Sequence, residues 1–304
     1  MPRLNIYLND DAHQLATRWR DKVSLSDICT RAIRDELSAR EDGRDIGNLA
    51  DAWAAPSSLE AELRRALRLQ VVRVVEADTT DEIDVRRRLG AAAAELVDRL
   101  VPDPCTLIIC GGRQIWEVVR SLHPRNIRAE ILALGTELIP SRIQHVNSNA
   151  MAIIASLLYQ PRATADIVTT YRTETGHYEG VTASFPNRIL LSSCSAIDTE
   201  TPYYTEVGND FFSDVKSVGA VSEFAYCFLD ETGREVDIGY PRPTRRLNTT
   251  GLKEWSRSDK TYVMLVAGGQ KKRRAIAACV VQGLCNTVVT DVATAKFILS
   301  EIGK

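Results

Sequence analysis

The chain has 304 residues, of which 44% are hydrophobic and 26% charged, and its formal net charge is −2. These values are ordinary for a globular protein of one or two domains. No apolar run approaches the roughly 18 uncharged residues that a membrane-spanning helix needs, and the N-terminus lacks the basic-then-apolar order of a secretory signal. We therefore expect a cytoplasmic protein without membrane contact. Because the net charge gives no attractive field for nucleic acid, any DNA binding must be local.

The cysteines and histidines predict neither a disulfide framework nor a metal site. The seven cysteines are odd in number and include no C-x-x-C pair, and the four histidines are scattered along the chain. Most of the cysteines lie in apolar segments, which is typical of reduced, buried thiols. We expect no metal and no cofactor.

The first eight residues alternate between polar and apolar side chains, which is the period of a β-strand with one apolar face. Two amphipathic helices are expected after this strand, and the second begins at Ser24. This strand–helix–helix unit, residues 1–42, is too small to bury a stable core alone. We therefore expect a second copy of the chain to pair with the strand, so that the unit forms a homodimer.

Two such strands would form a ribbon whose outer face carries Arg3, Asn5 and Tyr7. A two-stranded ribbon fits the major groove of double-stranded DNA, where Arg binds guanine and Asn pairs with adenine. Residues 2–40 resemble the ribbon-helix-helix family of Arc- and MetJ-type repressors. The resemblance implies that the backbone around Ser24 and Leu25 anchors a DNA phosphate, a role that suits a helix N-terminus.

One alternative for this unit remains open. Residues 1–42 contain seven Lys and Arg against eight Asp and Glu, so the unit is not basic. The ribbon could then serve dimerisation without DNA. After it, residues 43–57 form the expected linker, which is polar, contains two glycines and ends at Pro56 and Ser57. The large domain is expected over residues 58–304.

From residue 58 onward, strand and helix patterns alternate. Short apolar strands between helices are typical of a parallel sheet covered on both faces. The predicted fold class is therefore α/β, with a Rossmann-like, doubly wound, mostly parallel sheet, and in such sheets ligands bind at the carboxyl ends of the strands. The expected strands are 70–75, 105–112, 129–134, 187–196, 261–269 and 286–291, and the expected helices are 59–69, 85–101, 113–122, 147–159, 270–283 and 292–303.

Three of these strand ends carry residues suited to ligand binding. Gly111 and Gly112 follow one strand and allow a ligand to approach the backbone closely. Gly268 and Gly269 follow another, and the cations 271–274 oppose the dipole of the next helix, which is unusual unless at least one of them faces an anionic partner. The alternative is a solvated basic face or a surface that docks acidic segments. Asp291 ends the last strand and either caps the final helix or accepts a ligand hydroxyl.

The large domain resembles the effector-binding domain of SorC/DeoR-type sugar-responsive transcriptional regulators. The segments that carry the resemblance are "LEAELRRALRLQVVRVVEA", "LGAAAAELVDRLV", "IICGGRQIWEVV", "GAVSEFAYCFLDETGREV" and "VMLVAGGQKKRRAIAACVVQGLCNTVVTDVATA". The resemblance implies a fold related to glucosamine-6-phosphate deaminase and ribose-5-phosphate isomerase without their catalysis. It also implies a phosphorylated sugar, or a similar phosphate ester, as effector, and a homotetramer.

Carried over residue by residue, the family's phosphate-side loop falls on Gly111, Gly112, Arg113 and Gln114, its lysine on Lys272 and its acidic residue on Glu223. The chain departs from the family pattern at three places. Arg113-Gln114 stands where Ser or Thr is common, Ser222 replaces a glycine, and residues 192–204 replace a glycine-containing segment. The family also has an N-terminal helix-turn-helix where this chain has the ribbon pattern.

The sequence thus predicts a DNA-binding transcriptional regulator that acts as a repressor. Its operator binding is expected to respond to a phosphorylated metabolite, and we expect that it is not an enzyme. Two alternatives remain. An isomerase- or deaminase-like enzyme would need a base, for which Asp291, Glu223 and Asp230 are the candidates. A nucleotide-sensing DNA-binding protein would use Arg113, Tyr203 and Tyr204 for base or ribose contacts.

Overall fold

The computed structural model describes residues 57–77, 80–135, 147–168, 181–197, 215–237 and 245–302. The predicted ribbon-helix-helix unit lies outside these ranges, as does the linker up to Pro56. The domain boundaries and the dimer therefore stay predictions. The same holds for the predicted contact residues Arg3, Asn5, Tyr7, Ser24, Leu25, Tyr203 and Tyr204.

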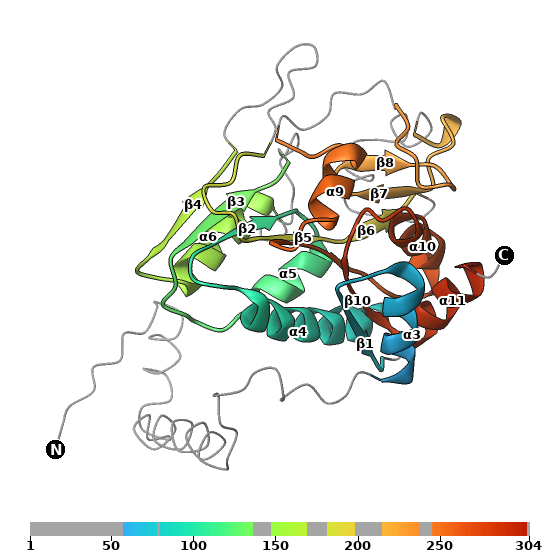
Figure 1. Cartoon of the computed structure of the whole chain (residues 1–304), viewed down its shortest axis with the longest axis horizontal. Helices are drawn as coiled ribbons and strands as arrows, with labels where there is room; N and C mark the ends of the chain where they lie inside the picture. The colour runs from blue at the N-terminus through green and yellow to red at the C-terminus, as the bar shows by residue number, and fades with distance from the viewer. Residues whose placement is uncertain are drawn as a thin grey trace, which may run out of the picture. The chain divides into compact units, whose positions relative to one another are not determined.

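A seven-stranded parallel sheet forms the centre of the described part of the chain (Figure 1). Every neighbouring pair of its strands is parallel. All five residues of both β2 and β10 are buried, as expected for a sheet covered on both faces. The predicted mostly parallel α/β sheet is confirmed. In sheet order its strands are β1 (Val71–Val75), β10 (Thr287–Asp291), β9 (Thr261–Val266), β5 (Arg188–Ser192), β2 (Cys105–Ile109), β3 (Ala129–Ala133) and β4 (Ala163–Asp166).

Helices cover this sheet in two groups. The chain steps from β2 to β3 to β4 in one direction and later from β5 to β9 to β10 in the other, so right-handed crossovers place the two sets of helices on opposite faces. The first group is α4 (Glu82–Leu100), α5 (Arg113–Val119) and α6 (Ser148–Leu158), and the second is α3 (Ser58–Leu67), α9 (Thr249–Ser256), α10 (Arg273–Val281) and α11 (Val292–Ile302).

A small antiparallel sheet, which the sequence did not predict, packs against α10. It consists of β6 (Cys194–Ala196), β7 (Ser222–Phe224) and β8 (Cys227–Leu229). The prediction of one strand over 187–196 was therefore wrong: Ser193 separates β5 of the large sheet from β6 of the small one. An apolar run gives no sign of such a change of sheet, because both strands are buried.

Other details of the helices and strands also differ from the prediction. The helix expected from residue 270 begins with a 3-10 turn, η3 (Gln270–Lys272), before α10 starts at Arg273. The short edge strand β4 and the helix α9 were not predicted at all.

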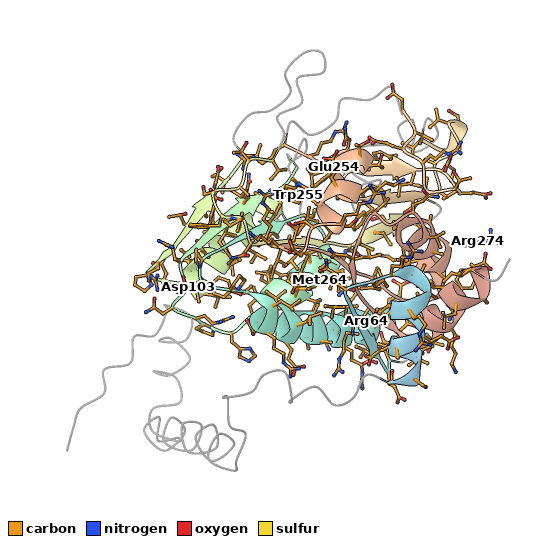
Figure 2. All side chains as sticks on the ribbon, viewed as in Figure 1. Arg64, Asp103, Glu254, Trp255, Met264 and Arg274 are labelled. Carbon is orange, nitrogen blue, oxygen red and sulfur yellow. The ribbon has the colours of Figure 1, made fainter. Side chains whose placement is uncertain are left out.

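The core lies between the sheets and the helices. Met264 of β9 is fully buried in the middle of the packed side chains (Figure 2), whereas Arg64, Asp103 and Arg274 are exposed. The six described cysteines are all buried and unpaired, so the prediction of reduced thiols is confirmed for them. Burial also raises the pKa of the Cys110 thiol to about 12, which makes it a poor nucleophile.

Candidate functional site

The predicted effector residues of the large sheet lie along a single edge. Because β10, β9, β5 and β2 are adjacent and parallel, their carboxyl ends place Asp291, Gly268–Gly269, Ser192 and Gly111–Gly112 in a row. The chain leaves β2 toward β3 and leaves β5 toward β9, so the boundary between β2 and β5 is a topological switch point. Ligands of doubly wound sheets bind at such points.

The first glycine loop joins β2 to α5. Gly112 has φ +119°, and a Cβ added to it would meet no heavy atom within 4 Å. The backbone is therefore open to an approaching ligand on this side. The amide of Gly111 donates a hydrogen bond to the Tyr226 hydroxyl at 3.2 Å.

The two residues after this loop, Arg113 and Gln114, lie in different environments. Arg113 is exposed. Gln114 is buried, and its Nε2 donates a hydrogen bond to the backbone oxygen of Arg86 in α4 at 3.0 Å. In this arrangement Gln114 fastens α5 to α4, and its amide nitrogen is not directed at the strand ends.

The second glycine loop joins β9 to η3 and is held by Asp291. The fully buried Asp291 carboxylate accepts hydrogen bonds from the Gly269 amide at 2.7 Å, the Thr294 amide at 2.8 Å and the Thr294 hydroxyl at 2.7 Å. Of the two roles open to Asp291, the structure favours capping of α11. Through Gly269 the same carboxylate also fixes the loop. Gly269 has φ +92° and open space beside it.

Lys272 and Glu223 come together from distant parts of the chain. The Lys272 Nζ donates a hydrogen bond to the Cys194 backbone oxygen at 2.9 Å, at the junction of β5 and β6. Glu223 lies on β7, opposite Ser195 of β6. Burial lowers the pKa of the Lys272 ammonium. Burial also raises the pKa of Glu223 to about 7, against the opposing effects of the Tyr226 amide, Lys272 and Ser195.

The other cations of the 271–274 run have different surroundings. Lys271 forms an exposed ion pair with Glu82, at 2.9 Å between Nζ and Oε1. Arg274 is exposed (Figure 2), and the buried Nε of Arg273 has no hydrogen-bond partner among the described residues. Of these four, Lys272 is the one whose ammonium group reaches the ends of the sheet strands.

Sequence reasoning missed Tyr226 and Ser192. The Ala225 amide donates to the Ser192 hydroxyl at 3.2 Å, and the Tyr226 amide donates to the Glu223 Oε1 at 2.7 Å. Both amides belong to the two-residue loop between β7 and β8. The segment "SEFAYCFL" shows no regular alternation of polar and apolar residues, and its loop lacks the Asn-Gly or Asp-Gly pair that usually marks such turns, so the sequence carries no hairpin signal here.

The bases required by the enzyme alternative are mostly engaged elsewhere. Asp230 accepts hydrogen bonds within its own turn, from the Thr232 amide and hydroxyl and from the Arg234 amide. Asp291 is enclosed, as described above. Within the described ranges, no group of three or more His, Cys, Asp or Glu side chains could hold a metal ion, and no helix has the length and apolar character needed to cross a membrane.

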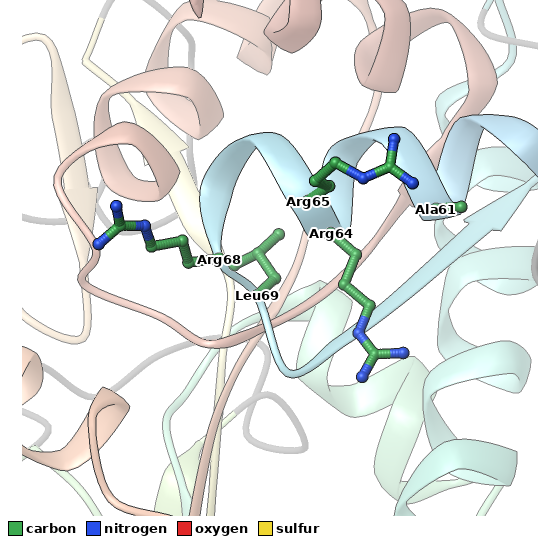
Figure 3. A pocket seen from close by; sticks show the side chains of 5 residues that line it. All are labelled: Ala61, Arg64, Arg65, Arg68 and Leu69. Atoms are coloured by element: carbon green, nitrogen blue, oxygen red, sulfur yellow. The ribbon is translucent and has the colours of Figure 1, made fainter.

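A separate hollow of about 460 Å³ lies at the end of α3 (Figure 3). It is lined by Ala61, Arg64, Arg65, Arg68 and Leu69. Leu69 precedes β1, so the hollow is at the amino end of the sheet, opposite the glycine loops. The three guanidinium groups point in different directions (Figure 3), and arginines at a helix C-terminus complement its dipole. The arginines of this hollow are therefore accounted for by the end of α3.

The fold and this row of strand ends define a ligand-binding α/β domain. The family described as "Putative sugar-binding domain" matches residues 52–165 and 198–300, more than half of the chain, and the chain belongs to this family. The family is described by sugar binding and not by a reaction, in agreement with the expectation of a protein that is not an enzyme. No curated protein sequence matches the chain.

Several solved structures share the fold. The full-length sorbitol operon regulator SorC from Klebsiella pneumoniae is 17% identical with a TM-score of 0.64, and the match covers 96% of this chain and 100% of that one. A DeoR family transcriptional regulator from Listeria monocytogenes is 14% identical with a TM-score of 0.63, over 80% and 99% of the two chains. A transcriptional regulator from Streptococcus pneumoniae TIGR4 is 17% identical with a TM-score of 0.61, over 81% and 97%.

Proposed function

We propose that the chain is a cytoplasmic transcriptional regulator, a repressor in kind, whose binding to operator DNA is modulated by a small phosphorylated metabolite, in the first place a sugar phosphate. The main support is the convergence of the two glycine loops, Lys272 and Glu223 at the carboxyl edge of the sheet. Membership of a sugar-binding family supports a sugar-type effector.

In this proposal each group has a distinct role. The backbone of Gly111–Gly112 and Gly268–Gly269 lies against the phosphate, which the Lys272 ammonium neutralises. Glu223 accepts hydrogen bonds from the effector's hydroxyl groups. Arg113, at the start of α5, is exposed and can extend toward the phosphate. Gln114 and Asp291 do not contact the effector in this proposal but hold α5 and the second glycine loop in position.

The identity of the sugar moiety is less closely defined than the phosphate, because residues near Glu223 lie outside the family match. The family match leaves out residues 166–197, an interval that contains all of β5 and all of β6. Ser192, Cys194 and Ser195 of this interval contact the Ala225 amide, Lys272 and Glu223, respectively. The surroundings of Glu223 thus depart from the family pattern, and we expect a different preference for the sugar moiety there.

DNA binding is assigned to the N-terminal ribbon, which lies outside the described residues. Arg3, Asn5 and Tyr7 would read bases in the major groove, while the backbone at Ser24 and Leu25 would hold a phosphate. The structural neighbours from Listeria monocytogenes and Klebsiella pneumoniae are a transcriptional regulator and an operon regulator, which supports this use. Two ribbon dimers in a homotetramer would engage two half-sites with a spacing set by the assembly.

Regulation would follow from linkage between the two sites. The effector must bind the DNA-competent and the incompetent arrangement with different affinity, since equal affinity shifts nothing. A coupling of about 1–3 kcal/mol, roughly 5- to 150-fold in affinity, is enough for a switch.

The test is retention of genomic DNA fragments by the full chain at moderate salt, with and without a panel of sugar phosphates and nucleotides. Specific fragments whose retention changes with a sugar phosphate support the proposal. A response to nucleotides alone would favour nucleotide sensing instead. Turnover of a sugar phosphate without DNA retention would favour the enzyme.

A further inference from the structure

The hairpin loop between β7 and β8 has an unfavourable backbone conformation. The pairing of Phe224 with Cys227 leaves only Ala225 and Tyr226 in the loop, with φ values of 50° and 67°. Positive φ at both positions is normal for a two-residue hairpin, but such loops are usually built from Asn and Gly. For other residues this region costs roughly 1–2 kcal/mol each. Other contacts must therefore hold the loop in place.

These contacts come from the ends of β2, β3 and β5. The Tyr226 hydroxyl accepts the hydrogen bond of the Gly111 amide after β2. The Tyr226 ring lies against Gly135 after β3, where an added Cβ would be only 2.2 Å from the ring. Ser192, at the end of β5, accepts from the Ala225 amide. The loop is thus clamped onto the carboxyl edge of the sheet.

The Tyr226 hydroxyl occupies a position that matters for ligand binding. The Gly111 amide has one hydrogen, and it is given to Tyr226, so an anion can take this donor only by replacing the hydroxyl. The Tyr226 amide is bonded to Glu223, which means that a movement of Tyr226 would also release that carboxylate. One residue therefore connects the first glycine loop to Glu223 on the small sheet.

We infer that the Tyr226 hydroxyl is an internal ligand of the Gly111 amide, a latch that closes the first glycine loop in the free protein and that an anionic oxygen of the effector displaces. This inference rests on the proposed function for the nature of the effector, but the latch itself does not. Displacement frees a hairpin held in a costly conformation, and the small sheet then carries the change to α10, against which it packs.

The test compares the full-length wild type with Tyr226→Phe, which keeps the ring against Gly135 and removes only the hydroxyl. Tyr262→Phe, on β9, is the matched control. Hydrogen exchange of the peptide containing Gly111 is measured without ligand. We expect faster exchange in Tyr226→Phe and no change in the control. Unchanged exchange in Tyr226→Phe would overturn the latch.

Binding is then measured with inorganic phosphate, glucose 6-phosphate and ribose 5-phosphate. Removal of the competing hydroxyl should tighten binding by roughly 2- to 10-fold, the range for one ordinary hydrogen bond. Equal or weaker binding by Tyr226→Phe would overturn displacement by the effector. If no probe binds either protein, the phosphorylated effector of the proposed function fails, whereas the exchange result still decides the latch.

Discussion

The carboxylate of Asp291 accepts a hydrogen bond from the amide of Gly269 at 2.7 Å, which joins the end of β10 to the glycine loop after β9. The same carboxylate caps α11 through Thr294. Two neighbouring strand ends therefore share one buried acceptor, and the shape of the loop depends on it.

Replacement of Asp291 should destabilise the fold. Asp291→Ala leaves the Gly269 amide and both Thr294 donors without their acceptor in a buried place, at a cost of about 2–4 kcal/mol. Asp291→Asn keeps one acceptor oxygen and should lose less. Urea unfolding of the two variants gives the free energies. Equal stability of Asp291→Ala and wild type would contradict the capping role.

Gly268 should not tolerate a methyl group. A Cβ there would lie 2.4 Å from the Asp291 Oδ2 and 2.8 Å from the Leu89 Cδ1. We expect Gly268→Ala to lose about 1–3 kcal/mol of stability through overpacking. Gly251→Ala is the control, because Gly251 lies in α9 and an added Cβ there meets its nearest neighbour at 3.3 Å. Thermal unfolding should show this variant unchanged or slightly more stable, by up to about 1 kcal/mol.

Glu223 should make the stability of the protein dependent on pH. Burial raises its pKa to about 7, above the ordinary value near 4.3, so the folded protein holds this proton more tightly than the unfolded chain does. The protonated Glu223 therefore contributes to the free energy of unfolding at low pH. This contribution is lost as the pH rises from the ordinary pKa toward the raised one, and the loss is on the order of 1–3 kcal/mol.

Glu223→Gln should remove this loss. The free energy of unfolding of the variant, minus that of the wild type, should therefore be larger at pH 8 than at pH 5. Urea unfolding at both pH values measures it. The exposed Glu62→Gln on α3 is the control and should give parallel curves. A difference between Glu223→Gln and wild type that does not change with pH would contradict the shifted pKa.

Lys272 should be required for the response to the metabolite. Lys272→Met keeps the length of the side chain and removes the charge that the proposal assigns to the phosphate. We expect DNA retention that no longer changes with the metabolite, and unchanged DNA affinity without it. Lys271→Met, which removes the neighbouring ammonium paired with Glu82, should leave the response intact. Loss of the response in both variants would point to a general effect of charge.

Asn5 should contribute to operator discrimination. If Asn5 pairs with adenine, Asn5→Ala should cost about 1–3 kcal/mol of preference for the operator over unrelated DNA and leave the assembly intact. Binding to operator and scrambled duplexes, with sedimentation as the measure of assembly, tests this. Asn48→Ala in the expected linker should change neither. An equal loss of affinity for the operator and the scrambled duplex would indicate that Asn5 contacts the DNA backbone and not a base.

The sequence by itself determined the parallel α/β sheet and the two glycine loops. Short apolar strands between amphipathic helices can only be buried in such a sheet, and a strand followed by two glycines marks its carboxyl edge. The importance of Lys272 and Glu223 came from the family resemblance. That the two side chains lie close together could not be predicted from the sequence, since they are 49 positions apart.

Only the tertiary structure decided how these groups are used. The position of Tyr226 depends on the register of a hairpin that has no turn signature, and its bond to Gly111 spans 115 residues. The division of residues 187–196 between two sheets and the choice of Asp291 as a cap were also settled by packing. Local sequence specifies which segments become strands and helices, but hydrogen bonds between distant segments form only when the whole core closes around them.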